Sequence, residues 1–335
     1  MVMNLELGLK PKKKSHIGKL VVFIVFQLIF GILVMPLLIF YGPFKHVTKT
    51  VVGTSWATLN HRYIAQFFLS DSRIEKIIGP DYALNPLEAG ATLRKLNFFV
   101  NHDKRIDVLN ISGAGFTGKM LVIHDPTRIA VGASSTMPES GETTGRIAKN
   151  LGAAAAINAG GFSDEGWAGV GGAPDGFVIQ KGKVTYNSYG DDSIELNFVG
   201  MDKDGMLQVG VKSATDLITS GVNEAISFGP ALVINGEGTI TQGDGGWGIA
   251  PRTAIGQKAN GEVIFLVIDG RSVWSLGATL KDVQDIMIQY GAVNACNLDG
   301  GSSATMYYQG KLMNRPSDGL GERAVPTAFV VMGAS

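Results

Sequence analysis

The chain has 335 residues, enough for one large domain or two small ones, so length alone does not fix the number of domains. Its 29 basic and 29 acidic residues give zero formal charge, which excludes the basic footprint typical of nucleic-acid-binding proteins. The 45 glycines concentrate after position 110 and favour a strand- and turn-rich domain over a helical bundle. The single cysteine, Cys296, excludes an internal disulfide, and its place in an apolar run is typical of a small buried residue.

Near the N-terminus, residues 20–40 form an uncharged apolar run interrupted by one glutamine, one glycine and one proline. As a helix this run would extend about 30 Å, the hydrocarbon thickness of a bilayer. Five lysines precede the run and two follow it closely: Lys10, Lys12, Lys13, Lys14 and Lys19, then Lys45 and Lys49. The positive-inside rule therefore predicts a single-pass protein of the cell membrane, with a cytoplasmic N-terminus and the remainder outside. A cleaved signal peptide is the alternative, but its apolar segment would be shorter, about 7–15 residues, so we expect an uncleaved anchor.

Residues 43–80 carry aromatic and aliphatic side chains at three- and four-residue spacing, which predicts helices. Two interpretations stay open for this segment: a stalk that holds a domain off the membrane, or an amphipathic segment that packs on the membrane surface or a partner. Residues 81–96 are typical of a linker. The predicted domains are a basic tail (1–19), a transmembrane helix (20–41), a helical stalk with its linker (42–95) and a folded domain (96–335).

The folded domain is predicted to be mostly β-strand with a few helices. Strands are expected at 105–111 and 119–124, and helices at 143–151 and 279–290. Further hairpins are expected at 177–180 with 184–186, 194–199 with 206–211, 253–257 with 262–268, and 304–308 with 312–314, followed by a buried strand at 325–332. The fold class is therefore α+β, a large mixed, strand-rich sheet domain with a few flanking helices, preceded by one transmembrane helix and a helical stalk.

Residues 262–298 form a strand–helix–strand unit. Thr279 and Asp282 fit a capping box at the start of its helix. The two strands of such a unit are expected to lie parallel, joined by a right-handed crossover. Their carboxyl ends would place Asp269 and Asp299 at the same edge of the sheet, where open α/β sheets bind ligands.

Asp299 is followed directly by Gly300, Gly301, Ser302 and Ser303. Two glycines allow a close approach of the backbone to a ligand, and successive backbone N–H groups can form an anion-binding nest. Five other motifs occur in a fixed order around it: Asn-Ala-Gly-Gly-Phe (158–162), Phe-Gly-Pro (228–230), Pro-Arg-Thr-Ala-Ile-Gly (251–256) leading to Asp-Gly-Arg (269–271), Asn-Arg-Pro-Ser-Asp (314–318) and Gly-Glu-Arg (321–323).

Together and in this order, these motifs resemble the phosphodiester glycosidase domain of the NAGPA type, over roughly residues 100–333. The resemblance implies removal of a sugar, typically N-acetylglucosamine, from a phosphodiester. Many bacterial members of this family are connected with exopolysaccharide or cell-wall polymers. The implied substrate is a carbohydrate or glycopolymer phosphodiester in the envelope or outside the cell.

Most glycosidases use two carboxylates, and the candidate catalytic residues are Asp299, Glu322 and Asp269. We expect Asp299 to be the nucleophile or base and Glu322 its partner, with the individual roles and the stereochemistry left open. Arginine holds two phosphate oxygens with its planar fork. The predicted substrate- and phosphate-binding residues are Arg252, Arg323, Asn158, Gly160, Gly161, Gly300, Gly301, Ser302, Ser303, Asn314, Ser317 and Asp318.

No cofactor is required by this chemistry, although the acidic and amide groups could hold Ca²⁺ or Mg²⁺ through oxygen. His102 and His124 lack the spacing of zinc ligands. The sequence therefore predicts a membrane-anchored extracellular glycosidase that acts on a sugar phosphodiester. The alternative is a non-catalytic glycan-binding or assembly module for exopolysaccharide or cell-wall polymer.

Overall fold

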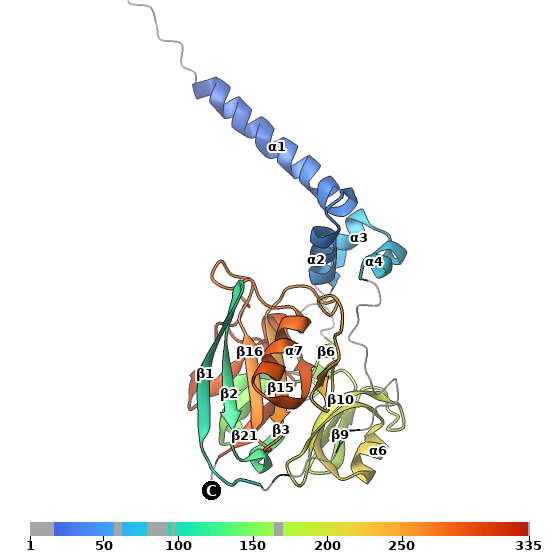
Figure 1. The fold of residues 1–335 in the computed structure, drawn as a ribbon, viewed down its shortest axis with the longest axis vertical. Coiled ribbons are helices and arrows are strands. Elements are labelled where there is room, and N and C mark those ends of the chain that lie inside the picture. The colour runs from blue at the N-terminus through green and yellow to red at the C-terminus, as the bar shows by residue number, and fades with distance from the viewer. Residues whose placement is uncertain are drawn as a thin grey trace, which may run out of the picture.

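A long N-terminal helix leads through three short helices into a strand-rich domain (Figure 1). The structure, a computed structural model, describes residues 17–56, 62–78, 93–94, 98, 100–163 and 170–333. The four helices are α1 (Ile17–Tyr41), α2 (Lys45–Trp56), α3 (Arg62–Phe68) and α4 (Asp71–Ile78). The most apolar stretch of 18 residues within α1 has a mean hydropathy of 2.8, so the predicted apolar helix is confirmed as long and apolar enough to cross a membrane. Most of the predicted linker at 81–96 lies outside the described residues.

Helices α1 to α4 pack on one another around a small apolar core of their own. Phe40 from α1, Val52 from α2 and Ile74 from α4 are buried in it. The Thr48 hydroxyl donates to the Ile39 carbonyl at 2.5 Å, and the Tyr41 hydroxyl donates to the Phe68 carbonyl. The end of α1 is therefore fixed to the three short helices by both apolar packing and hydrogen bonds.

The largest sheet has seven strands in the order β1-β2-β16-β15-β17-β13-β14. Their bounds are β1 (Ile106–Gly113), β2 (Phe116–Ile123), β13 (Ala231–Ile234), β14 (Glu237–Gly238), β15 (Arg252–Lys258), β16 (Val263–Ile268) and β17 (Ala292–Leu298). Strand β15 pairs antiparallel with both β16 and β17, so those two strands run parallel with β15 between them. The predicted parallel arrangement is confirmed. Helix α7 (Leu280–Gln289) connects β16 to β17 and begins with the predicted capping box of Thr279 and Asp282.

Two five-stranded sheets complete the domain, in the orders β11-β10-β12-β8-β9 and β19-β18-β5-β21-β3. Their strands are β3 (Ile129–Ala133), β5 (Ala153–Asn158), β8 (Phe177–Gln180), β9 (Lys183–Asn187), β10 (Leu196–Asp202), β11 (Leu207–Lys212), β12 (Val222–Ser227), β18 (Met306–Tyr308), β19 (Lys311–Leu312) and β21 (Thr327–Met332). Short pairs and helices lie beside them: β4 (Glu142–Thr143) with β20 (Ala324–Val325), β6 (Phe162–Ser163) with β7 (Ala173–Pro174), α5 (Thr144–Asn150) and α6 (Ala214–Thr219). The predicted fold class and the four predicted hairpins are confirmed.

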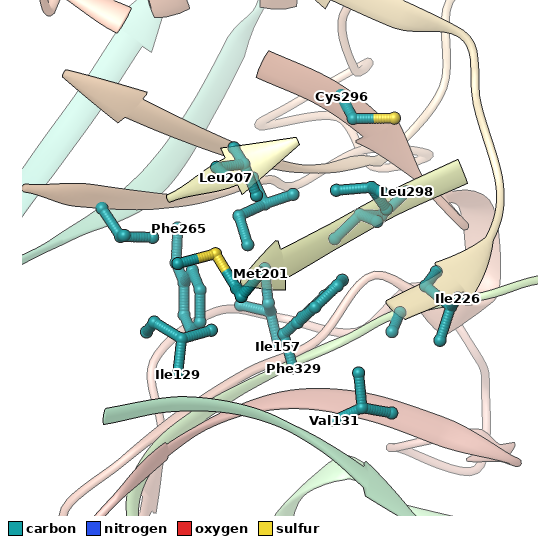
Figure 2. Close-up of a cluster of buried hydrophobic side chains, with 14 of the residues drawn as sticks. Ile129, Val131, Ile157, Met201, Leu207, Ile226, Phe265, Cys296, Leu298 and Phe329 are labelled. Atoms are coloured by element: carbon teal, nitrogen blue, oxygen red, sulfur yellow. The ribbon is translucent and has the colours of Figure 1, made fainter. Parts of the chain in front are cut away.

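The main core lies where the three large sheets face one another (Figure 2). Phe265 comes from the seven-stranded sheet, Met201 from the β10 sheet and Phe329 from the β21 sheet, and all three are almost fully buried. Burial of each such side chain contributes roughly 1.5–3 kcal/mol to stability. Cys296 lies in the same core, and burial raises the pKa of its thiol far above the ordinary value. The predicted burial of this cysteine is confirmed.

Candidate active site

Asp299 follows the last residue of β17 and is fixed from two sides by the end of β5. Its backbone N–H donates to the Ala159 carbonyl at 2.9 Å, and its own carbonyl accepts from Asn158 Nδ2 at 2.5 Å. Asn158 is fully buried, and its Oδ1 accepts from the Thr253 hydroxyl at 2.8 Å and from the Thr305 amide at 3.1 Å. With both ends of its amide bonded inside the protein, Asn158 positions Asp299 and does not face a ligand.

The Asp299 carboxyl lies in an unusual electrostatic environment. Its pKa is raised to about 6, chiefly because the charged form loses hydration on burial and in part because of the nearby Asp175 carboxylate. Ser303, Arg323 and the Gly300 amide lower the pKa and so limit the rise. The Ser303 hydroxyl is buried and makes no regular hydrogen bond elsewhere. A carboxyl with a pKa near the working pH of an enzyme is suited to proton transfer or nucleophilic attack.

Two arginines share the surroundings of Asp299. The guanidinium of Arg323 lies 4.7 Å from the centroid of the Phe162 ring. Arg271 Nη1 donates to the Ser302 hydroxyl at 3.2 Å. Burial lowers the pKa of Arg271, and Arg323 lowers it as well, whereas the Asp299 carboxylate acts in the opposite direction. Arg271 also has a left-handed backbone, with φ of 56°, which is uncommon for a residue with a side chain. Two guanidinium groups near one carboxylate can bind an anionic group such as a phosphate.

Asp175 is a site residue that the sequence analysis missed. Its backbone N–H donates to the Gly161 carbonyl at 2.9 Å, and its Oδ1 accepts from the Ser163 hydroxyl at 2.7 Å. Gly161 lies close against the Phe228 ring: a Cβ there would be 2.9 Å from it, so the position suits glycine. In the sequence, Pro174-Asp175-Gly176 has the composition of an ordinary turn, so only the pairing of β6 with β7 shows that this carboxylate influences Asp299.

Glu322, the predicted partner of Asp299, contacts helix α5. Its Oε2 accepts from the Gly145 amide at 2.9 Å, and burial raises the pKa of its carboxyl while that amide lowers it. A cavity of about 530 Å³ adjoins it, lined by Gly145, Arg146, Lys149, Asn150, Tyr307, Gly310, Leu312 and Glu322. The contacts of Glu322 therefore connect it with this neighbouring cavity, whereas those of Arg323 connect that residue with Asp299.

Asp269 lies at the predicted edge of the sheet, but its carboxylate is engaged by the chain itself. Oδ1 accepts from the Arg315 amide at 2.9 Å and from Asn314 Nδ2 at 3.2 Å. Asn314 in turn donates to the Ala304 carbonyl at 3.0 Å and accepts from the Met306 amide at 2.8 Å. Asp269 and Asn314 thus fasten the segment after β19 to the sheet edge, which favours a structural role for both.

Arg252, predicted to bind phosphate, is buried and bonded to backbone carbonyls. Nε donates to Ala278 at 3.0 Å, and Nη2 donates to Trp247 at 2.9 Å and to Gly248 at 2.6 Å. Burial lowers its pKa to about 10. Since these bonds turn the guanidinium toward the 247–248 loop, the geometry favours Arg271 and Arg323 over Arg252 as phosphate ligands.

The turn after Asp299 is tightly closed. The Gly301 amide donates to the Pro251 carbonyl at 2.9 Å and the Ser303 amide to the Gly300 carbonyl at 3.1 Å. A Cβ at Gly300 would lie 2.6 Å from the Pro251 oxygen, so only glycine fits there. These two amides hold the turn together. They are therefore not free to bind an anion, and the predicted nest of N–H groups loses two of its donors.

Three other predicted ligands make hydrogen bonds within the protein. Gly160 donates its amide to the Thr327 hydroxyl at 3.1 Å, and the Ser317 hydroxyl donates to the Gly301 carbonyl at 3.3 Å. Asp318 Oδ1 accepts from the Leu320 amide at 3.0 Å. Within the described part of the chain, no three His, Cys, Asp or Glu side chains form a group that could hold a metal ion.

Comparison with known proteins identifies the family of the folded domain. Residues 151–332 match the family described as phosphodiester glycosidase. An uncharacterized SPbeta prophage-derived protein of Bacillus subtilis, YomE, is 32% identical over 219 residues, which cover 62% of this chain and 31% of that protein. Human N-acetylglucosamine-1-phosphodiester alpha-N-acetylglucosaminidase is 31% identical over 136 residues, which cover 36% of this chain and 26% of that enzyme. The chain thus spans about a third or less of the length of these relatives.

The fold has a solved counterpart. The catalytic domain of the zebrafish N-acetylglucosamine-1-phosphodiester alpha-N-acetylglucosaminidase, auto-inhibited by its pro-peptide, superposes with a TM-score of 0.60. The alignment covers 76% of this chain and 92% of that chain at 24% sequence identity, so it bears on the fold alone.

Proposed function

Because the chain belongs to the phosphodiester glycosidase family, we propose that it hydrolyses the bond between a sugar, such as N-acetylglucosamine, and the phosphate of a phosphodiester. The observation that carries the proposal is the Asp299 carboxyl, with a pKa of about 6, beside Arg271 and Arg323. In this reaction the bond from the anomeric carbon to the phosphate oxygen breaks. Water supplies a hydroxyl to the sugar and a proton to the phosphate monoester that leaves.

Asp299 is proposed as the nucleophile or base, which must be ionised to act. The departing phosphate is already a good leaving group, so it needs charge stabilisation more than a proton. Arg323 and Arg271 supply this stabilisation, and it strengthens as charge gathers on the departing oxygen. Asp175 is the second carboxylate that the contacts bring closest to this chemistry, while Glu322 borders the neighbouring cavity and could contact the remainder of a larger substrate.

The proposal includes the location of the enzyme. Helix α1 would anchor residues 42–335 at the outer face of the cell membrane, because the lysines before it exceed those after it. The folded domain would begin near residue 96, after the helical stalk. Glycopolymers of the envelope or of an exopolysaccharide are the expected substrates at this location.

The test is hydrolysis by the full chain in detergent or nanodiscs. UDP-N-acetylglucosamine and simple alkyl esters of N-acetylglucosamine 1-phosphate are the probes, and released sugar is the readout. Release by the wild type and its loss in Asp299→Asn would support the proposal. Binding of these compounds without release of sugar would instead identify a glycan-binding module.

A further inference from the structure

Two exposed apolar loop tips lie next to the candidate active site. In the loop after Arg271, Val273 is 90% exposed, Trp274 79% and Leu276 60%. In the turn before Glu322, Leu320 is 98% exposed. We call these four residues the apolar rim. Exposed apolar side chains grouped at a site are typical of contact with a partner or a membrane.

Each tip is a turn closed by backbone hydrogen bonds and lies next to a site residue in the chain. Ser272 and Ser275 exchange backbone hydrogen bonds of 2.9 and 3.2 Å, which present Val273 and Trp274 at the apex. In the second tip, the Gly321 amide donates to the Asp318 carbonyl at 3.1 Å. Arg271 precedes the first tip and Arg323 follows the second, so both proposed phosphate ligands stand at the base of the rim.

The first tip of the rim lies at the end of the domain that faces α1. The Leu276 amide donates to the Gly115 carbonyl at 2.7 Å, which fastens the first tip to the turn between β1 and β2. In Figure 1 this turn is at the end of the domain nearest the helices, and the C-terminus is at the opposite end. The first tip and the candidate transmembrane helix are therefore on the same side of the molecule, and the charge interaction of Arg271 with Arg323 places the base of the second tip near that of the first.

A close helix contact joins the domain to α2. Gly53 of α2 is buried, and a Cβ there would lie 3.2 Å from the Gly246 oxygen and 3.4 Å from the Gly248 nitrogen. The lack of a side chain lets the helix backbone lie directly on this loop. Arg252 holds the same loop by bonds to the carbonyls of Trp247 and Gly248. Since α2 also packs on α1, the membrane helix and the site are joined by continuous packing.

We infer that the apolar rim contacts the outer surface of the bilayer and that the site takes sugar phosphodiesters whose alcohol is a membrane lipid. The inference rests on the proposed function. A charged site at the base of an apolar rim matches an amphiphile whose sugar and phosphate are polar and whose tail stays in the membrane. Aromatic side chains such as Trp274 are favoured at the membrane interface. Cleavage would release the sugar and leave the lipid phosphate monoester in the bilayer.

Contact with lipid can be measured without activity. Cys296 is buried, so a fluorophore can be attached selectively to Val273→Cys or Leu320→Cys in the full chain. In nanodiscs containing lipids with a nitroxide near the headgroup, both labels should be strongly quenched. Tyr189→Cys is the matched control, because Tyr189 is also exposed and its loop is joined to α6, far from α1, by a bond from the Thr215 amide to the Asp192 carbonyl. Equal quenching at all three positions, or none at the rim, would overturn the assignment.

The substrate class is tested with two esters of N-acetylglucosamine 1-phosphate, one with methanol in solution and one with a long-chain alcohol embedded in the nanodisc. The double variant Val273→Ser/Leu320→Ser should lose about tenfold or more on the embedded ester, since two apolar contacts are removed. Its rate on the soluble ester should stay within about twofold, as should both rates of Tyr189→Ser.

Equal losses of the double variant on both esters, or cleavage of the soluble ester alone by the wild type, would overturn the lipid-linked substrate. Cleavage of neither ester by the wild type would overturn the proposed function instead. In that case the quenching experiment still decides whether the rim lies in the membrane.

Discussion

Asp269 and Asp299 occupy equivalent places, each directly after one of the two parallel strands β16 and β17, but their environments differ. The Asp269 carboxylate accepts hydrogen bonds from the Arg315 amide and the Asn314 side chain, which fix a loop. The pKa of Asp299 is raised to about 6, mainly by burial, and its carboxyl interacts electrostatically with Arg271, Arg323 and Asp175. A position at the carboxyl end of a strand is thus shared by a residue that stabilises the site and a residue that can react in it.

The sharpest test of this difference is the same substitution at both aspartates. Asp299→Asn keeps the shape and removes the ionisable carboxyl, so turnover should fall by about 10²–10⁴-fold. Asp269→Asn keeps an oxygen that can accept from the Arg315 amide, so turnover should stay within about tenfold of the wild type. Rates of sugar release, with circular dichroism to confirm folding, provide the measurement. Similar rate losses in the two variants would remove the distinction.

The arginines allow a second comparison. Arg271→Lys keeps the charge but loses the planar fork, so the rate on a phosphodiester should fall about 10- to 100-fold, with a smaller loss on a neutral aryl glycoside. Arg252→Lys should leave this preference unchanged and lower the melting temperature, because carbonyls of Trp247, Gly248 and Ala278 lose donors at about 1–3 kcal/mol for a buried group. A rate loss in Arg252→Lys that is specific to the phosphodiester would show that Arg252 does bind the phosphate.

The pH dependence of the rate extends the comparison to the ionised state of Asp299. If the carboxylate form acts, kcat/KM should rise with pH through about 6. Asp175→Asn should move the midpoint lower, because Asp175 raises the pKa of Asp299. Asp269→Asn is the control and should leave the midpoint in place. A rate that falls as pH rises through this range would mean that the protonated form acts.

The smallest expected effect is on stability. The pKa of Asp299 is raised in the folded state from 3.8 to about 6. The free energy of unfolding therefore decreases as pH rises between these two values, and it remains at the lower level above them. Asn cannot ionise, and Asp299→Asn should therefore unfold at higher temperature than the wild type at pH 8, with little difference at pH 4. Thermal unfolding at the two pH values measures this. A variant less stable than the wild type at pH 8 would contradict the assigned environment.

Several features could be predicted from the sequence because they depend on neighbours along the chain. The apolar run of α1, the capping box of α7 and the hairpin turns are local patterns, and each appears where predicted. The parallel relation of β16 and β17 follows from the helix between them. These features placed Asp299 correctly at a sheet edge.

The composition of the site depended on tertiary contacts that no local pattern contains. Arg252 occurs in a family motif, but its three bonds to carbonyls from residues 247–278 turn it into a structural group. Asp175 resembles an ordinary turn residue until the pairing of β6 with β7 brings it near Asp299. The sequence itself therefore determined which residue types stand at the strand ends. The charge states and hydrogen-bond partners of those residues were decided by burial and by contacts between distant segments, because desolvation and Coulomb interactions depend on distance in space.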